Sequence, residues 1–158
     1  MTIQIDTREK ERAISGIIKE FEKQGVPYIV SKLYMADYMD WDNPRYVIDR
    51  KQNIREIATN CTTEQKRLEA ELEKLNEIGA HMTFLITQDR IGNKRIKSLE
   101  DLILWQPPKG HGTVNGETVF RKLRRWERMY PIDFQFCSKA EAGKVIIKLL
   151  RNGGDADG

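Results

Sequence analysis

The sequence predicts an α/β domain in which helices flank a mixed central β-sheet. Residues between Ala36 and Lys51 read as a strand-turn-strand unit, with the polar stretch 40–44 as the turn, and this unit predicts an antiparallel pair. A long helical stretch then leads into the apolar run Met82–Thr87, an order that predicts a parallel crossover. Antiparallel and parallel pairs in one sheet make the sheet mixed.

The N-terminal part is expected to form a strand, a helix and a second strand. Residues 3–6 alternate as a short strand, and the charged run 8–11 leads into a helix that ends at Gly25. The apolar residues of this helix recur on one side, which places it against the sheet: Ile14, Ile17, Ile18 and Phe21. Pro27 then precedes a strand over residues 28–34.

Helices dominate the rest of the chain. A short helix over 53–60 is followed by a longer one that Thr62 or Thr63 caps and Gly79 ends, and its core residues are Leu68, Leu72, Leu75 and Ile78. Ser98 begins a short helix through residue 103, and the stretch 117–130 forms another before a last strand over 132–136. Ser138 and Glu141 form a capping box for the closing helix, whose buried face is Ala142, Val145, Ile146, Leu149 and Leu150.

Composition indicates one globular domain. The chain has 158 residues, of which 32% are charged and 39% hydrophobic, and its net charge of +3 tolerates an anionic partner. We expect the domain to span residues 1–151 and the tail 152–158 to be disordered. Cys61 and Cys137 match no metal-ligand spacing, and no apolar run is long enough for a membrane span, so a cytoplasmic protein with reduced thiols is expected.

One stretch carries the chemistry. Asp49 and Lys51 are two apart on a strand, so their side chains leave the same face while Arg50 points away. If Asp37 completes this space, two carboxylates with a backbone carbonyl and waters would suit Mg²⁺ or Mn²⁺, and the lysine would orient a water or stabilise phosphate charge. The alternative is a surface hairpin whose Asp49 and Lys51 merely pair across solvent.

Two groups of basic residues are candidates for nucleic-acid contact. One surrounds Gly92 and Asn93 in a polar loop and consists of Arg90, Lys94 and Arg95. The other lies on the outer face of the helix 117–130 and includes Arg121, Arg124 and Arg125. A solvated turn and an ordinary solvated helix face are the alternatives.

Three blocks of the sequence resemble the nuclease domain of XPF-type structure-specific endonucleases, a branch of the PD-(D/E)xK superfamily. The stretch 5–9 is similar to the family's Asp-x-Arg-Glu, the stretch 36–38 to its Gly-Asp-Tyr, and the stretch 47–51 to its Glu-Arg-Lys. Ala36 stands where the family has glycine, and Asp49 where it has glutamate. The resemblance is best over the first 90 residues, and short phage and prophage proteins with endings similar to 116–118 and 134–137 extend it over nearly the whole chain.

This resemblance implies a restriction-endonuclease-like core and a Mg²⁺-dependent DNA endonuclease that hydrolyses phosphodiesters, with Mn²⁺ able to substitute. Asp37 and Asp49 would bind the metal and Lys51 would assist the water. Asp6, Arg8 and Glu9 would complete the pocket and contact the scissile phosphate or the water, and Arg50 of the third block is grouped with these catalytic residues.

The same resemblance leaves the substrate and the assembly open. No tandem helix-hairpin-helix module is found in the 158 residues, so the DNA substrate could be a flap, a junction, a nick or plain duplex. Family members commonly pair, so a homodimer is a further expectation. The rival interpretation is a non-catalytic nucleic-acid-binding or protein-interaction module on the same scaffold, such as a phage counter-defence protein that binds a host factor through the basic helix.

Overall fold

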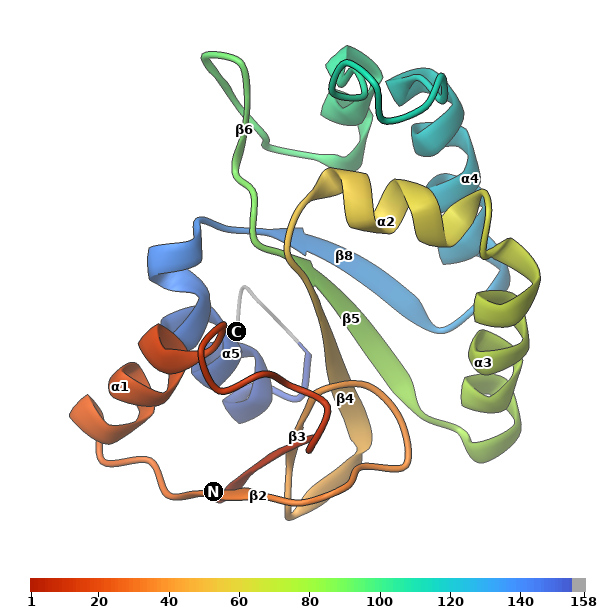
Figure 1. Cartoon of the computed structure of the whole chain (residues 1–158). Coiled ribbons are helices and arrows are strands. Elements are labelled where there is room, and N and C mark those ends of the chain that lie inside the picture. The colour runs from red at the N-terminus through yellow and green to blue at the C-terminus, as the bar shows by residue number, and fades with distance from the viewer. Residues whose placement is uncertain (155–158) are drawn as a thin grey trace.

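The computed structural model describes residues 1–154 and contains a six-stranded mixed sheet, as the sequence predicted (Figure 1). In spatial order the strands are β2 (Tyr28–Val30), β1 (Ile3–Ile5), β3 (Tyr38–Asp40), β4 (Asn43–Lys51), β5 (His81–Ile86) and β8 (Ile132–Phe136). β3 runs antiparallel to both β1 and β4, whereas β1 pairs with β2, β4 with β5 and β5 with β8 in parallel. The β4-to-β5 crossover is therefore confirmed.

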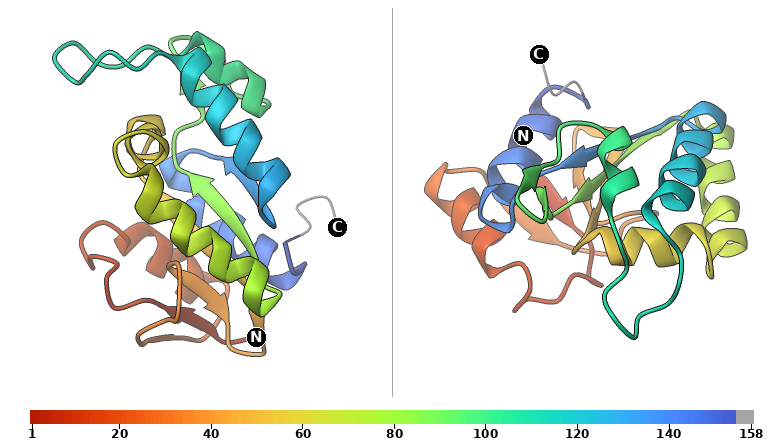
Figure 2. Two further views of the ribbon diagram at one scale, coloured as in Figure 1. Left: turned by 90° about the vertical axis from the view of Figure 1, so that its right-hand side faces the viewer. Right: turned by 90° about the horizontal axis from the view of Figure 1, so that it is seen from above.

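Helices cover both faces of this sheet (Figures 1 and 2). One face packs against α1 (Ser15–Lys23) and α5 (Ala142–Arg151) through a core that includes Phe21 and Ile146. The other face packs against a second group of elements through a larger core: α2 (Ile54–Cys61), α3 (Gln65–Ile78), the 3₁₀ helix η1 (Leu99–Leu104) and α4 (Gly116–Met129). A sheet between two helical layers gives both of its faces an apolar partner.

Several boundaries differ from the prediction. The turn between β3 and β4 is only Trp41 and Asp42, because Asp40 already pairs with Asn43. The second strand ends at Val30 rather than at residue 34, since the chain then bends so that the backbone N–H of Leu33 donates to Asp6 Oδ1. The helix expected to follow the run 8–11 begins only at residue 15.

The loop 88–97 and the tail were expected to be irregular, and Ser138 was expected to cap the closing helix itself. The loop 88–97 contains a small hairpin, β6 (Arg90–Ile91) and β7 (Lys94–Arg95). A short 3₁₀ helix, η2 (Lys139–Glu141), which Ser138 caps, precedes α5. The expected disordered tail is partly ordered, because the N–H of Gly154 donates to Leu149 O, and its residues 155–158 lie outside the described part of the chain. Within residues 1–154, none of the helices has the length and apolar character that a bilayer span requires.

The topology brings the three sequence blocks to one edge of the sheet. β1 and β4 point in the same direction, so their carboxyl ends lie at the same edge, and the antiparallel β3 between them begins there. Asp6 directly follows β1, Asp37 directly precedes β3, and Lys51 ends β4. Stretches that are far apart in the sequence thus meet within three adjacent strands.

Candidate active site

The end of β4 carries the predicted acid and lysine side by side. Lys51 Nζ lies 3.3 Å from Asp49 Oδ2, and the two side chains are only 11% and 16% exposed. The ammonium group also lies 5.9 Å from the centroid of the Phe84 ring on the neighbouring strand. The alternative of a surface hairpin with a solvent-exposed ion pair is therefore wrong, because both side chains are largely shielded from water. Burial also strengthens this charge pair relative to one in open water.

Asp37 is fixed by the backbone of the same strand. Its Oδ2 accepts a hydrogen bond of 2.8 Å from the backbone N–H of Arg50, and its own N–H donates to Ile48 O. The preceding Ala36 has φ 64°, within the left-handed region that favours glycine. The family's glycine at this position thus has a backbone reason, and the alanine here adopts the same turn with its Cβ in a disfavoured conformation.

The Asp37 and Asp49 carboxyl groups face each other. Burial raises the pKa of Asp37 to about 9, and the negative charge of Asp49, a hydrogen bond with Asp49 and the charge of Glu9 add to this effect. Two carboxylates this close repel each other when both are ionised, which disfavours the charged form of Asp37. A bound cation would remove the same repulsion.

These side chains fit a hard divalent cation. Carboxylate oxygens are the donors that Mg²⁺ and Mn²⁺ prefer, and Mg²⁺ usually takes one or two protein carboxylates and keeps several waters. Among residues 1–154 there is no group of three or more His, Cys, Asp or Glu side chains arranged to hold a metal. In the prediction from sequence, Asp37 and Asp49 would be two carboxylate ligands of an ion that completes its shell with backbone oxygen and water.

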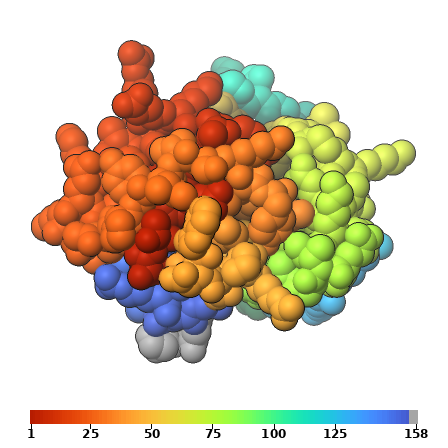
Figure 3. All heavy atoms as spheres, turned by 90° about the horizontal axis from the view of Figure 1, so that it is seen from below, coloured from red at the N-terminus to blue at the C-terminus, as the bar shows by residue number. Residues whose placement is uncertain are grey.

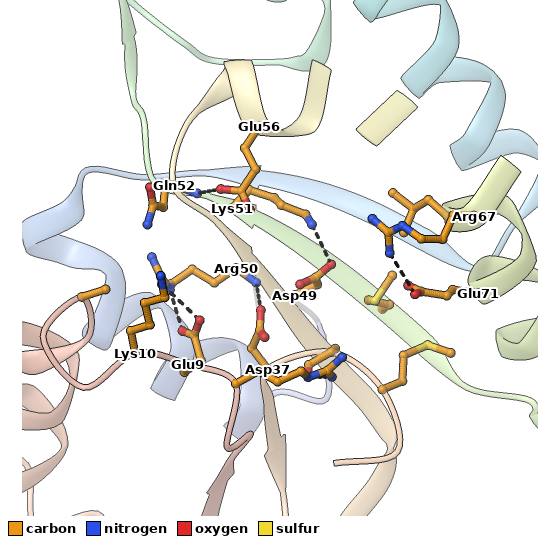
Figure 4. A pocket seen from close by; sticks show the side chains of 16 residues that line it. Glu9, Lys10, Asp37, Asp49, Arg50, Lys51, Gln52, Glu56, Arg67 and Glu71 are labelled. Atoms are coloured by element: carbon orange, nitrogen blue, oxygen red, sulfur yellow. Dashed lines mark hydrogen bonds and ion pairs between the residues drawn. The ribbon is translucent and has the colours of Figure 1, made fainter. Parts of the chain in front are cut away.

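The two acids lie in a pocket of about 300 Å³ (Figure 4). Sequence reasoning found several of its residues but missed four charged ones, of which one follows Glu9 and three lie on α2 and α3: Lys10, Glu56, Arg67 and Glu71. Arg67 and Glu71 on α3 form an ion pair of 3.2 Å, and Figure 4 places them across the pocket from Glu9. Figure 3 shows the orange surface of the N-terminal third of the chain beside the yellow-green surface of α3. Only the tertiary packing of α3 brings this polar pair to the sheet edge.

Glu9 and Arg50 form a fixed pair at the border of the pocket. Arg50 Nε and Nη2 donate to the two Glu9 oxygens at 2.7 and 3.1 Å, and Tyr38 Oη donates to Glu9 Oε2 at 2.7 Å. Both charged side chains are 9% exposed. The charges and hydrogen bonds of Glu9 and Arg50 are mutually satisfied, so neither side chain offers a free charge to a ligand.

Asp6 lies behind the pocket. Its side chain is fully buried, and its oxygens accept hydrogen bonds from the backbone N–H groups of Leu33 and Arg8 and from Arg8 Nε. Burial opposes ionisation, but these hydrogen bonds outweigh it and hold the pKa of Asp6 below its ordinary value. Asp6 is fully buried and does not line the pocket, and its contact with a phosphate or water stays a prediction. It positions Arg8, which lines the pocket, is 67% exposed and also donates to Ala36 O.

The predicted nucleic-acid contacts lie outside this pocket. Arg90, Lys94 and Arg95 are exposed on the β6–β7 hairpin, where Lys94 pairs with Asp101 at 3.2 Å. The α4 residues are partly engaged with neighbours: Arg121 pairs with Glu117, Arg124 with Glu100 and Glu127, and Arg125 Nε donates to Met129 Sδ. The structure brings neither group into the pocket with the acids, so their contact with nucleic acid stays a prediction.

Comparison with known families identifies the family of this chain. Residues 5–149 match the ERCC4 domain, the XPF-type nuclease domain. The chain belongs to the ERCC4 family. The ERCC4 assignment confirms the resemblance that the three sequence blocks carry, whereas the similarity to phage and prophage proteins stays a prediction. No curated protein gives a significant sequence match.

Solved structures with the same fold support the assignment. XPF from Aeropyrum pernix superposes with a TM-score of 0.66 at 17% identity, over 97% of this chain and 65% of that one. XPF from Aeropyrum pernix in complex with DNA gives a TM-score of 0.66 at 19% identity, over 96% of this chain and 64% of that one. The ERCC4 domain described here thus has the restriction-endonuclease-like fold and spans about two thirds of the XPF chains it matches.

Proposed function

We propose that this ERCC4 domain is a divalent-metal-dependent endonuclease that hydrolyses phosphodiester bonds in DNA. The observation that carries the proposal is the cluster of Asp37, Asp49 and Lys51, in which the lysine is buried and the two acids are partly buried. The two carboxyl groups face each other, and the ammonium group lies 3.3 Å from Asp49. A purely structural scaffold gains nothing from such a pair, because its mutual repulsion destabilises the empty fold.

The residues have distinct roles in this proposal. Asp37 and Asp49 would hold Mg²⁺, which when bound supplies Lewis-acid stabilisation of the charge that develops on the phosphate. Lys51 would orient the attacking water or stabilise the same charge, since its Nζ lies beside Asp49 and faces the pocket. Arg8 also lines the pocket, and its side chain is 67% exposed, so it would contact a phosphate oxygen.

DNA is the proposed substrate, and a branched or partly unpaired DNA is the proposed class. The ERCC4 family and the Aeropyrum pernix XPF complex with DNA support this choice. The exposed hairpin residues Arg90 and Arg95 would extend the contact to neighbouring phosphates. A homodimer and a cytoplasmic location remain proposals on the sequence and the family resemblance alone.

Cleavage assays test the proposal. Supercoiled plasmid, flap, four-way junction and plain duplex are incubated with the wild type, Lys51→Met and the control Lys66→Met, whose lysine is exposed on α3. In Mg²⁺ we expect the wild type and the control to cut at least one substrate, and Lys51→Met to cut about 100-fold more slowly or worse. Binding without cleavage by the wild type would reject the nuclease and favour a non-catalytic DNA-binding module.

A further inference from the structure

Asn60 on α2 is an unusual buried side chain. It is 5% exposed, and its Oδ1 is the one buried side-chain oxygen or nitrogen within residues 1–154 that has no hydrogen-bond partner. Buried amides normally have their hydrogen bonds satisfied, so an orphaned acceptor indicates a ligand or another missing partner. None of the residues assigned to the catalytic pocket accounts for it.

Asn60 lies on the wall of a second pocket. This pocket of about 450 Å³ lies along α2 and the first turn of α3, and it is large enough for a small organic group. It shares four wall residues with the catalytic pocket: Lys51, Gln52, Glu56 and Arg67. A group that enters the second pocket is therefore a direct neighbour of whatever lies against Asp49 and Lys51.

The chemistry of the wall favours a neutral polar ring over an anion. Lys51, Arg55 and Arg67 line the pocket, but Glu56 and Glu64 offset most of their positive charge, so the wall is not an all-cationic site for a second phosphate. Asn60 Oδ1 is turned away from solvent, and a rotation of the Asn60 side chain would let its amide accept from a base N–H and donate to a ring acceptor, which is how Asn and Gln read nucleobases. Arg55 and Arg67 are exposed at the pocket, and the flat face of a guanidinium group stacks on a base.

We infer that this pocket binds the unpaired base of the nucleotide next to the scissile phosphate, with Asn60 as the residue that hydrogen-bonds the base edge. The inference rests on the proposed function, because it places the scissile phosphate at Lys51. A base within a duplex already has its pairing edge occupied and is stacked on both sides. The pocket would therefore select DNA in which a nucleotide next to the cleavage point is free to leave the helix.

The loop 107–115 borders the same side of the molecule. In both views of Figure 2 it extends from the body on the side of α2, and Arg55 Nη1 lies 3.3 Å from His111 Nδ1 of this loop. The contact fixes the wall residue Arg55 against the loop, so that its guanidinium is held at the pocket by a segment outside α2 and α3.

A fluorescent base tests the inference independently of cleavage. Flap and single-stranded DNAs carry 2-aminopurine at successive positions and are titrated with protein in Ca²⁺, with DNA integrity checked on gels. The variants are Asn60→Leu, which removes the hydrogen bonds at similar size, Asn60→Ser in case the first does not fold, and the control Asn76→Leu, exposed on α3. Fluorescence anisotropy measures DNA affinity in parallel.

In the wild type and in Asn76→Leu we expect a fluorescence change at one position of the DNA. In the Asn60 variants we expect this change to be at least about fivefold smaller. DNA affinity should fall less than the fluorescence signal does. Bound DNA without a position-specific change, an Asn60 variant with the wild-type signal, or no DNA binding at all would each overturn the inference. A clear Asn60-dependent signal on DNA that stays uncut in Mg²⁺ would support the base pocket and reject the nuclease proposal.

Discussion

Two partly buried aspartates at opposite edges of one sheet have opposite electrostatics. Asp37, at the carboxyl edge, faces Asp49, and burial together with that like charge raises its pKa. Asp133 on β8, at the amino edge, accepts hydrogen bonds from Thr83 Oγ1 at 2.5 Å, from His81 Nε2 at 3.2 Å and from Gln135 Nε2 at 3.4 Å. Burial opposes its ionisation too, but these partners outweigh it and hold the pKa of Asp133 below its ordinary value.

The difference separates a carboxylate whose neighbours satisfy its charge from one whose neighbours oppose it. Asp133 completes a chain of hydrogen bonds that continues from Thr83 to the buried Tyr46 hydroxyl at 2.7 Å. Asp37 has a backbone donor and a competing acid, so it is stabilised only when something positive arrives. Substitutions at Asp133 and Asp37 test this electrostatic contrast.

The largest effect on stability is expected at Asp133, whose carboxylate has its hydrogen-bond partners in place. Asp133→Ala leaves the Thr83 hydroxyl and His81 without their acceptor, and we expect it to lower the free energy of unfolding by about 2 to 4 kcal/mol. Thermal and urea unfolding measure the change, and Asp42→Ala, at an exposed aspartate of the β3–β4 turn, is the control. A loss no greater than that of the control would remove Asp133 as the structural counterpart of Asp37.

Substitution of Asp37 should change the free energy of unfolding in the opposite direction. Asp37→Asn keeps an oxygen for the Arg50 N–H but removes the charge that burial and Asp49 oppose. Without metal at neutral pH we expect a gain of about 1 to 3 kcal/mol, or roughly 2 to 4 °C in Tm for each kcal/mol. Added Mg²⁺ should stabilise the wild type and not this variant. A variant less stable than the wild type without metal would contradict the electrostatic interpretation.

The pH dependence of the two variants should also differ. The folded-state pKa of Asp37 is raised from 3.8 to about 9, so its ionisation costs stability progressively as pH rises through that interval, and the stability gained by Asp37→Asn should grow from about pH 4 upward. The pKa of Asp133 is lowered, so its contribution is complete above the unfolded-state value and is lost as pH falls below it. Urea unfolding at a series of pH values measures both, and parallel profiles for the two variants would be the contrary result.

Basic residues show the same contrast between engaged and free groups. Arg121 is paired with Glu117, whereas the Arg95 side chain has no ion-pair or hydrogen-bond partner among residues 1–154. We expect Arg95→Ala to weaken DNA binding about three- to tenfold at low salt and Arg121→Ala to weaken it less, because each free cation at a phosphate releases counterions. Anisotropy titrations at two salt concentrations measure this, and a larger loss for Arg121→Ala would place the DNA on α4.

The smallest effect is expected at Ala36. Glycine adopts a φ of 64° without the Cβ clash that alanine has, although it also raises the entropy of the unfolded chain. We therefore expect Ala36→Gly to raise the free energy of unfolding by no more than about 1 kcal/mol and to leave metal affinity unchanged. A marked destabilisation in urea unfolding would mean that the left-handed turn before Asp37 is not strained.

The sequence predicted the parts of the site that local periodicity controls. Asp49 and Lys51 share a face because a strand repeats every two residues, and this pairing needs no knowledge of the fold. Arg67 and Glu71 could not be assigned, because on α3 they look like any solvated pair until the helix is placed across the sheet edge. The burial of Asp6 could not be predicted for the same reason, since its main-chain partner Leu33 becomes adjacent only after folding.

Binding of Mn²⁺, followed by electron paramagnetic resonance, tests the central claim most directly. The wild type and Asp133→Asn should each bind one Mn²⁺ per chain at the pocket, and Asp37→Asn and Asp49→Asn should each weaken that binding at least about tenfold. Equal Mn²⁺ affinity in the wild type and in both pocket variants would contradict the account, because the facing carboxyl groups would then not be the metal site.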